Sequence, residues 1–135
     1  MKFGGTVVYV DDVPAVLDFY HRAFGFETRF FDKTYGYGEL ETGGPPVAFA
    51  SHQLGAMLMP GGYVRPESGH HESGVEIAFV TTDVPAAFTK AVGAGSVAVA
   101  EPKVMPWGAT VAYVRSAEGT LIGLSTPASG SGGSA

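Results

Sequence analysis

The tetrapeptide DVPA occurs twice in this chain, at residues 12–15 and again at residues 83–86. The first copy follows TVVYVD and the second follows IAFVTT, so each copy stands after a run of β-branched and aromatic residues that is typical of a strand. The two copies are 83 − 12 = 71 residues apart, close to half of the 135-residue chain. This spacing indicates an internal repeat.

An aspartate followed by valine and proline predicts the start of a helix. The Asp side chain can accept hydrogen bonds from the free N–H groups of the first turn, and proline lacks a donor that this turn would not use. The residues at helical spacing after the two copies are Val16, Leu17, Tyr20, Ala23 and Phe24, and then Ala87, Phe88, Ala91 and Val92. Glycine follows both stripes, so we predict helices near residues 13–24 and 84–92.

Three short segments follow each predicted helix and are separated by turn signals. In the first half they read ETRFFDKTYGYGEL, ETGGPPVAFASHQL and AMLMPGG, and in the second half SVAVAEP, ATVAYVR and GTLIGLSTP. We interpret each set as a three-stranded meander. The sequence therefore predicts an α+β fold of two βαβββ modules, at residues 1–60 and 75–127, within a single domain. A linker at 61–74 joins the modules, and a low-complexity tail occupies residues 128–135.

Composition argues against several classes of protein. A hydrophobic content of 45% can form a core, yet no apolar run approaches the roughly 20 residues of a membrane span. A net charge of −5 with only eight Lys and Arg argues against binding to nucleic acid. Zero Cys excludes disulfides and zinc–thiolate sites, and the N-terminus lacks the pattern of a signal peptide. We expect a cytoplasmic protein with neither membrane nor nucleic acid among its partners.

Three segments carry a resemblance to a known family: VVYVDDVPAVLDFYHRAFGF, VEIAFVTTDVPAA and PWGATVAYVRSAEGTLIGL. Together with the two βαβββ modules, they resemble the vicinal oxygen chelate superfamily, which includes glyoxalase I, fosfomycin-resistance proteins, bleomycin-binding proteins and extradiol dioxygenases. The resemblance covers residues 2–127. It implies a cupped mixed sheet around a cavity, with His and Glu at inward-facing strand positions as ligands of a divalent metal in the metalloenzymes.

The resemblance places expected metal ligands at Gly5, Glu76 and Gly123, and 76 − 5 = 71 agrees with the repeat. Two of these residues have no side chain. Applying the repeat to the last position, 123 − 71 = 52, indicates His52, which alternatively lies at a strand end facing solvent. His52 and Glu76 are therefore the candidate metal ligands. Because two side chains hold a divalent metal poorly, we expect no tightly bound cofactor, or else a weakly held Fe, Mn, Ni or Zn.

Glu76 interrupts an otherwise apolar strand, and its alternate neighbours Ala78 and Val80 should share its face. We predict that its carboxylate lies in or near the cavity, where a metal, a cation or a hydrogen-bond donor must partner it. Aromatic and methionine residues on or near strands are candidates for the cavity wall, or alternatively for the core beneath the helices. The candidates for ligand contact are Phe49, Met57, Met59, Trp107 and Tyr113.

Three functional classes fit these observations. The first is a small-molecule-binding protein that sequesters an aromatic or cationic compound without a metal. The second is a divalent-metal-dependent enzyme, glyoxalase-like or dioxygenase-like, whose metal site has only two protein ligands, His52 and Glu76. The third is a regulatory or scaffold module. In each case we expect a homodimer, because an open sheet leaves unpaired strand edges that proteins commonly cover by association.

Overall fold

The computed structural model describes residues 1–65 and 74–127. The chain divides into two compact units, Met1–Arg65 and Pro66–Ala135. Most of the predicted linker at 61–74, and all of the predicted tail at 128–135, lie outside the described residues. Within the described ranges, no helix is both long enough and apolar enough to cross a bilayer.

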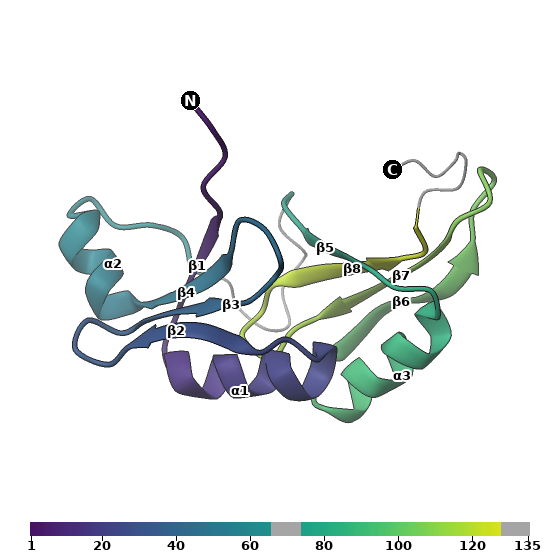
Figure 1. Cartoon of the computed structure of the whole chain (residues 1–135), viewed down its shortest axis with the longest axis horizontal. Coiled ribbons are helices and arrows are strands. Elements are labelled where there is room, and N and C mark those ends of the chain that lie inside the picture. The colour runs from purple at the N-terminus through teal and green to yellow at the C-terminus, as the bar shows by residue number, and fades with distance from the viewer. Residues whose placement is uncertain (66–73, 128–135) are drawn as a thin grey trace. The chain divides into compact units, whose positions relative to one another are not determined.

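The first unit is one mixed sheet with two helices. Its elements in chain order are β1 (Thr6–Val10), α1 (Val13–Phe24), β2 (Thr28–Asp32), β3 (Tyr37–Leu40), β4 (Val47–Ser51) and α2 (His52–Leu58). The strand order is β1-β4-β3-β2, with β1 parallel to β4 and the other pairs antiparallel. Helix α1 packs against β3 and β4 and covers one face of the sheet (Figure 1).

The second unit repeats the sheet and its first helix, without a counterpart of α2 among its described residues. Its elements are β5 (Ile77–Val80), α3 (Val84–Gly93), β6 (Val97–Val104), β7 (Thr110–Arg115) and β8 (Leu121–Ser125). The strand order is β5-β8-β7-β6, with β5 parallel to β8, and α3 packs against β6, β7 and β8. The described residues thus form two four-stranded mixed sheets, which confirms the predicted α+β class.

Each DVPA segment begins a helix, as predicted. The Asp12 carboxylate accepts a hydrogen bond from the backbone N–H of Ala15 at 3.1 Å, and Asp83 accepts one from Ala86 at 3.0 Å. Proline occupies the first turn of both helices. Helix α1 ends at Gly25, whose φ of 84° is a left-handed conformation that glycine adopts without strain. The repeated tetrapeptide is therefore a repeated helix cap.

Three strands follow the first helix as predicted, but the third predicted segment is not one of them. The segment ETRFFDKTYGYGEL holds two strands, β2 and β3, and AMLMPGG lies in α2 and the turn after it. The Ser51 side chain caps α2 by accepting a hydrogen bond from the backbone N–H of Leu54 at 3.0 Å. Gln, Leu, Ala and Met all favour a helix once such a cap is present. A short apolar run does not by itself distinguish a strand from a helix.

Each core lies between a sheet and its helix. In the first unit the rings of Tyr20 on α1 and Phe49 on β4 lie 4.7 Å apart, and both residues are fully buried. Gly38 on β3 allows a close approach, since a Cβ there would lie 2.7 Å from Cδ1 of Leu17. In the second unit alternate residues of β7 and three consecutive residues of β8 are buried, and α3 packs against both strands. The opposite face of each sheet therefore carries the residues that could meet a ligand.

Candidate functional site

The face of the second sheet that points away from α3 carries Glu76 and Tyr113. Strand pairing places both Ala78 of β5 and Tyr113 of β7 directly beside Gly123 of β8. The residues on either side of Tyr113 and Gly123 are buried on the helix side. Because side chains alternate along a strand, Tyr113, Gly123 and Ala78 share the outer face, and Glu76 joins them two residues before Ala78.

Glu76 and Tyr113 meet in the space above Gly123. A Cβ atom at Gly123 would collide with Oε2 of Glu76 and would lie 3.1 Å from Cε1 of Tyr113. Burial, the charge of Glu76 and the hydrogen bond from the phenol to that carboxylate, in that order, raise the pKa of Tyr113. The pair is therefore a neutral phenol that donates to a carboxylate, and glycine at 123 makes room for it.

Strand register corrects the placement of His52. In the parallel pairing of β1 with β4, the first residue pair is Thr6 with Val47. In the parallel pairing of β5 with β8, the first residue pair is Ile77 with Ile122. These pairs span 47 − 6 = 41 and 122 − 77 = 45 residues, so the second unit has four more residues between its first and last strands. The repeat distance of 71 for the first strands thus becomes 75 for the last strands. The counterpart of Gly123 is Ala48, because 123 − 75 = 48, and His52 is the first residue of α2.

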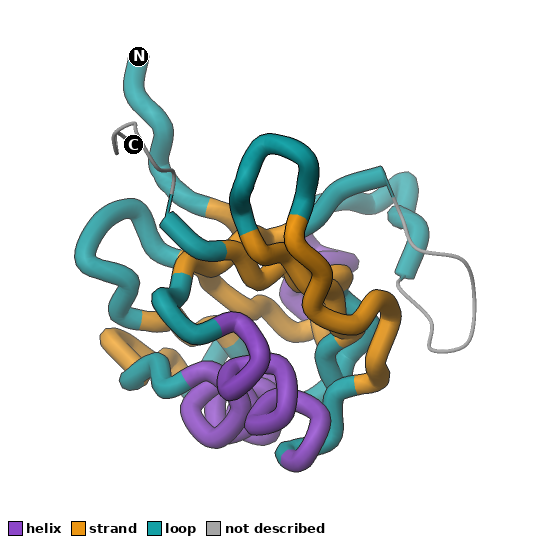
Figure 2. Tube along the Cα trace, turned by 90° about the vertical axis from the view of Figure 1, so that its right-hand side faces the viewer, coloured by secondary structure: helices purple, strands orange, loops and turns teal. Residues whose placement is uncertain are grey.

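The residues at the expected ligand positions do not fit a metal ion. Gly5, Ala48 and Gly123 have no ligating atom in their side chains, which leaves Glu76 alone. The chain reaches β1 through an extended loop (Figure 2), and Gly5 in it has φ 141°, with a Cβ there only 2.7 Å from the Pro46 carbonyl oxygen. In residues 1–65 and 74–127, no three His, Cys, Asp or Glu side chains gather as a metal site would require.

His52 instead contacts Tyr63, which is not among the candidates indicated by the sequence. Its Nδ1 lies 2.6 Å from Oη of Tyr63, and its Nε2 lies 3.6 Å from Oδ1 of Asp11. The His52 side chain is only 12% exposed, so it does not face solvent at a strand end. Tyr63 lies in PGGYV, where the glycines indicate only a turn, and no local pattern points to a contact with His52.

A second tyrosine–glutamate pair lies on the outer face of the first sheet. The Tyr37 hydroxyl donates to Oε2 of Glu39 at 2.7 Å, and Nε of Arg29 lies 3.7 Å from Oε1. Burial, followed by the bond to Glu39 and its charge, raises the pKa of Tyr37 to about 12. Glu39 pairs with Ala48 as Tyr113 pairs with Gly123, so the two pairs occupy related places in their sheets. Alternation of Tyr37 and Glu39 around Gly38 was the signal available in the sequence.

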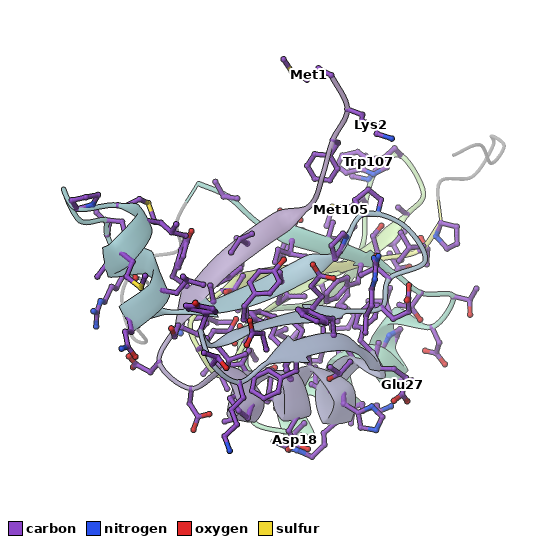
Figure 3. The ribbon with its side chains drawn as sticks, turned by 60° about the vertical axis from the view of Figure 1, so that its left-hand side comes forward. Met1, Lys2, Asp18, Glu27, Met105 and Trp107 are labelled. Carbon is purple, nitrogen blue, oxygen red and sulfur yellow. The ribbon has the colours of Figure 1, made fainter. Side chains whose placement is uncertain are left out.

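The remaining candidates for ligand contact do not lie on the outer face of a sheet. Phe49 is on β4 but is fully buried against Tyr20, in the core beneath α1. Met57 is exposed on α2, and Met59 follows the last residue of that helix, so neither lies on a strand. Trp107 is exposed in the turn between β6 and β7 (Figure 3). Among the named candidates, the structure pairs Glu76 with Tyr113.

The family model of the Glyoxalase/Bleomycin resistance protein/Dioxygenase superfamily matches residues 2–124. The chain belongs to this superfamily. No sequence among the curated proteins matches the chain. The match to the family model extends over most of the chain, and this extent establishes the membership.

Several solved structures share the superfamily fold. A glyoxalase-related enzyme from Fulvimarina pelagi has a TM-score of 0.78 at 18% identity, over 93% of this chain and 88% of that chain. A glyoxalase/bleomycin resistance protein/dioxygenase family enzyme from Burkholderia phytofirmans PsJN has a TM-score of 0.77 at 16% identity, over 93% and 98%. TioX from Micromonospora sp. ML1 has a TM-score of 0.67 at 21% identity, also over 93% and 98%. At these identities the likeness concerns the fold alone.

Proposed function

We propose that this superfamily member binds a small molecule on the outer face of the second sheet, and that recognition requires no metal ion. The observation that carries the proposal is the Glu76 carboxylate above Gly123, with Tyr113 as its hydrogen-bond donor. Positions 76 and 123 are both expected ligand positions, and the Glu76 side chain occupies the space that a side chain at position 123 would need. A carboxylate held in this way presents its remaining lone pairs to a ligand.

The surroundings of Glu76 favour an aromatic or cationic ligand. Ala78 and Val80 share its face and are exposed, which offers an apolar surface next to a negative charge. A planar cation, or a ring with an N–H donor, can pack on this surface while its donor meets the carboxylate. We propose sequestration of such a compound as the function that these residues serve.

Changing Glu76 to Gln should lower the affinity for a planar aromatic cation by about tenfold or more, because a hydrogen bond to a charged group contributes roughly 1.5 to 3 kcal/mol. The amide keeps the shape and removes the charge. Isothermal titration calorimetry with a panel of planar aromatic cations and their neutral analogues measures the effect. Glu101→Gln, at an exposed position of β6, is the matched control. Equal affinities of the Glu76→Gln variant and the parent protein would remove Glu76 as the anchor.

The alternative function is a metal-dependent lyase or oxygenase that uses His52 and Glu76. Superfamily membership supports it, whereas the donor set described above does not. Elemental analysis of the same purified proteins separates the two functions. We expect well below one equivalent of divalent metal in the parent protein. A full equivalent that is lost in a Glu76→Ala variant would favour the enzyme.

We also propose that the protein pairs as a homodimer. Strand β6 is an edge of the second sheet, and Val97, Val99 and Val104 on it are exposed. Apolar side chains along an unpaired edge are commonly covered by a second chain. Sedimentation equilibrium at micromolar concentration should show a dimer that Val99→Lys weakens. A parent protein that sediments only as a monomer would contradict this proposal.

A further inference from the structure

In the first unit, the side chain of Tyr63 is enclosed by three neighbours. Its ring lies 5.0 Å from the ring of Tyr9 and 5.7 Å from the imidazole of His52, on which it stacks. The third neighbour is Gly55 of α2, where a Cβ would lie 2.8 Å from Cε1 of Tyr63. Any larger residue at position 55 would meet the phenol. Tyr63 is therefore held in one place, with its hydroxyl directed at Nδ1 of His52.

The imidazole of His52 also has a defined orientation. Its Nε2 faces Oδ1 of Asp11 at 3.6 Å, and Nη1 of Arg65 lies 3.9 Å from the same oxygen. Asp11 comes from the junction of β1 and α1, one residue before the cap Asp12. A nucleophile within hydrogen-bonding distance of a base, with the base facing a third polar group, is the arrangement of an activated nucleophile. Tyr63, His52 and Asp11 are the nucleophile, the base and the third polar group of this arrangement.

Two other phenols of the chain provide a contrast. The hydroxyls of Tyr37 and Tyr113 donate to Glu39 and Glu76, and in both cases the carboxylate contributes to a raised pKa of the phenol. A negative neighbour opposes loss of the phenol proton. Tyr63 faces a ring nitrogen of His52 instead, which can accept a proton from the phenol. Tyr63 therefore differs from Tyr37 and Tyr113, because its hydroxyl faces an imidazole and theirs face carboxylates.

From this geometry we propose that Tyr63 is a nucleophile with His52 as its general base, and that the two form a second functional site for small electrophiles with an activated acyl, sulfonyl or phosphoryl group. In the reaction, Oη of Tyr63 bonds to the electrophilic carbon, sulfur or phosphorus. The bond to the leaving group breaks, and the leaving group departs with the electron pair. The phenol proton passes to Nδ1 of His52. This site shares no residue with the one proposed on the second sheet.

Labelling with an aryl sulfonyl fluoride tests the proposal, because the reagent forms a sulfonate ester with phenols and releases fluoride. We expect Tyr63 to react at least about tenfold faster than Tyr37 and Tyr113, since general-base assistance typically contributes a factor of a hundred or more. His52→Gln should lower the rate at Tyr63 by about tenfold or more. Rates are measured at each tyrosine by peptide mass spectrometry over a time course. His21→Gln is the matched control, because His21 also faces a carboxylate, with Nδ1 3.5 Å from Oε2 of Glu27.

A second variant keeps the test valid if His52→Gln disturbs the fold. Asp11→Asn leaves the helix cap at Asp12 in place and should lower the rate at Tyr63 by a smaller factor. Unchanged labelling of Tyr63 in both variants would overturn the proposal. So would an adduct on His52 in place of Tyr63, or labelling that follows exposure, with Tyr35 at 56% exposed reacting first.

Discussion

Replacing Phe49 with alanine should lower the free energy of unfolding by about 3 to 5 kcal/mol, the usual cost of removing a buried aromatic ring. The ring is fully buried on β4 and packs against Tyr20 of α1. A domain of this size is stabilised by about 5 to 15 kcal/mol in total, so the variant should lose much of its margin. Urea denaturation followed by far-ultraviolet circular dichroism measures the difference.

Phe3→Ala is the control for this prediction, because the same ring is removed from a residue that is 71% exposed. Its stability should stay within about 0.5 kcal/mol of the parent protein. The comparison also tests the assignment of Phe49 to the core. Should Phe49→Ala prove as stable as the parent protein but weaken ligand binding, the ring would belong to a ligand contact and its assignment to the core would be wrong.

Gly123→Ala should have the second large effect. The new Cβ would occupy the space of the Glu76 carboxylate and approach Tyr113, so overpacking should cost about 1 to 3 kcal/mol of stability. The pKa of Tyr113 should fall, because the charge and the hydrogen bond of Glu76 both raise it and both would be weakened, whereas the effect of burial remains. Affinity for a cationic ligand should fall by about tenfold or more for the same reason.

The ionisation of Tyr113 is measured by ultraviolet absorbance during an alkaline titration, as the difference from the same titration of a Tyr113→Phe protein. Gly93→Ala in α3 is the control, because a Cβ there meets nothing within 4 Å. That change should be neutral or stabilise the protein by up to about 1 kcal/mol, since alanine restricts the unfolded chain. An unaltered titration of Tyr113 in the Gly123→Ala protein would show that Glu76 does not lie above Gly123.

Most of the fold could be predicted from local signals. The Asp–Val–Pro caps depend on residues within four positions of one another, and both helices begin where these caps predict. A short apolar run fits both a strand and a helix, so the segment after β4 resembles a strand unless the cap at Ser51 is taken into account. A single repeat distance misplaces His52, because the second unit has four more residues between its first and last strands.

Local patterns in the sequence are enough to show that the chain repeats a strand–helix–strand plan, and that Gly5 and Gly123 bring no ligating side chain to their positions. Which distant residues come into contact depends on the packing of the folded chain. Glu76 and Tyr113 are 113 − 76 = 37 residues apart, and they lie together because β5 and β7 both pair with β8 in a register that places Gly123 beside them. Tyr63 reaches His52 because the chain folds back after α2 and Gly55 leaves room for the ring. Caps and periodicity depend on neighbours in the chain, whereas strand order, register and such close approaches depend on packing between distant segments.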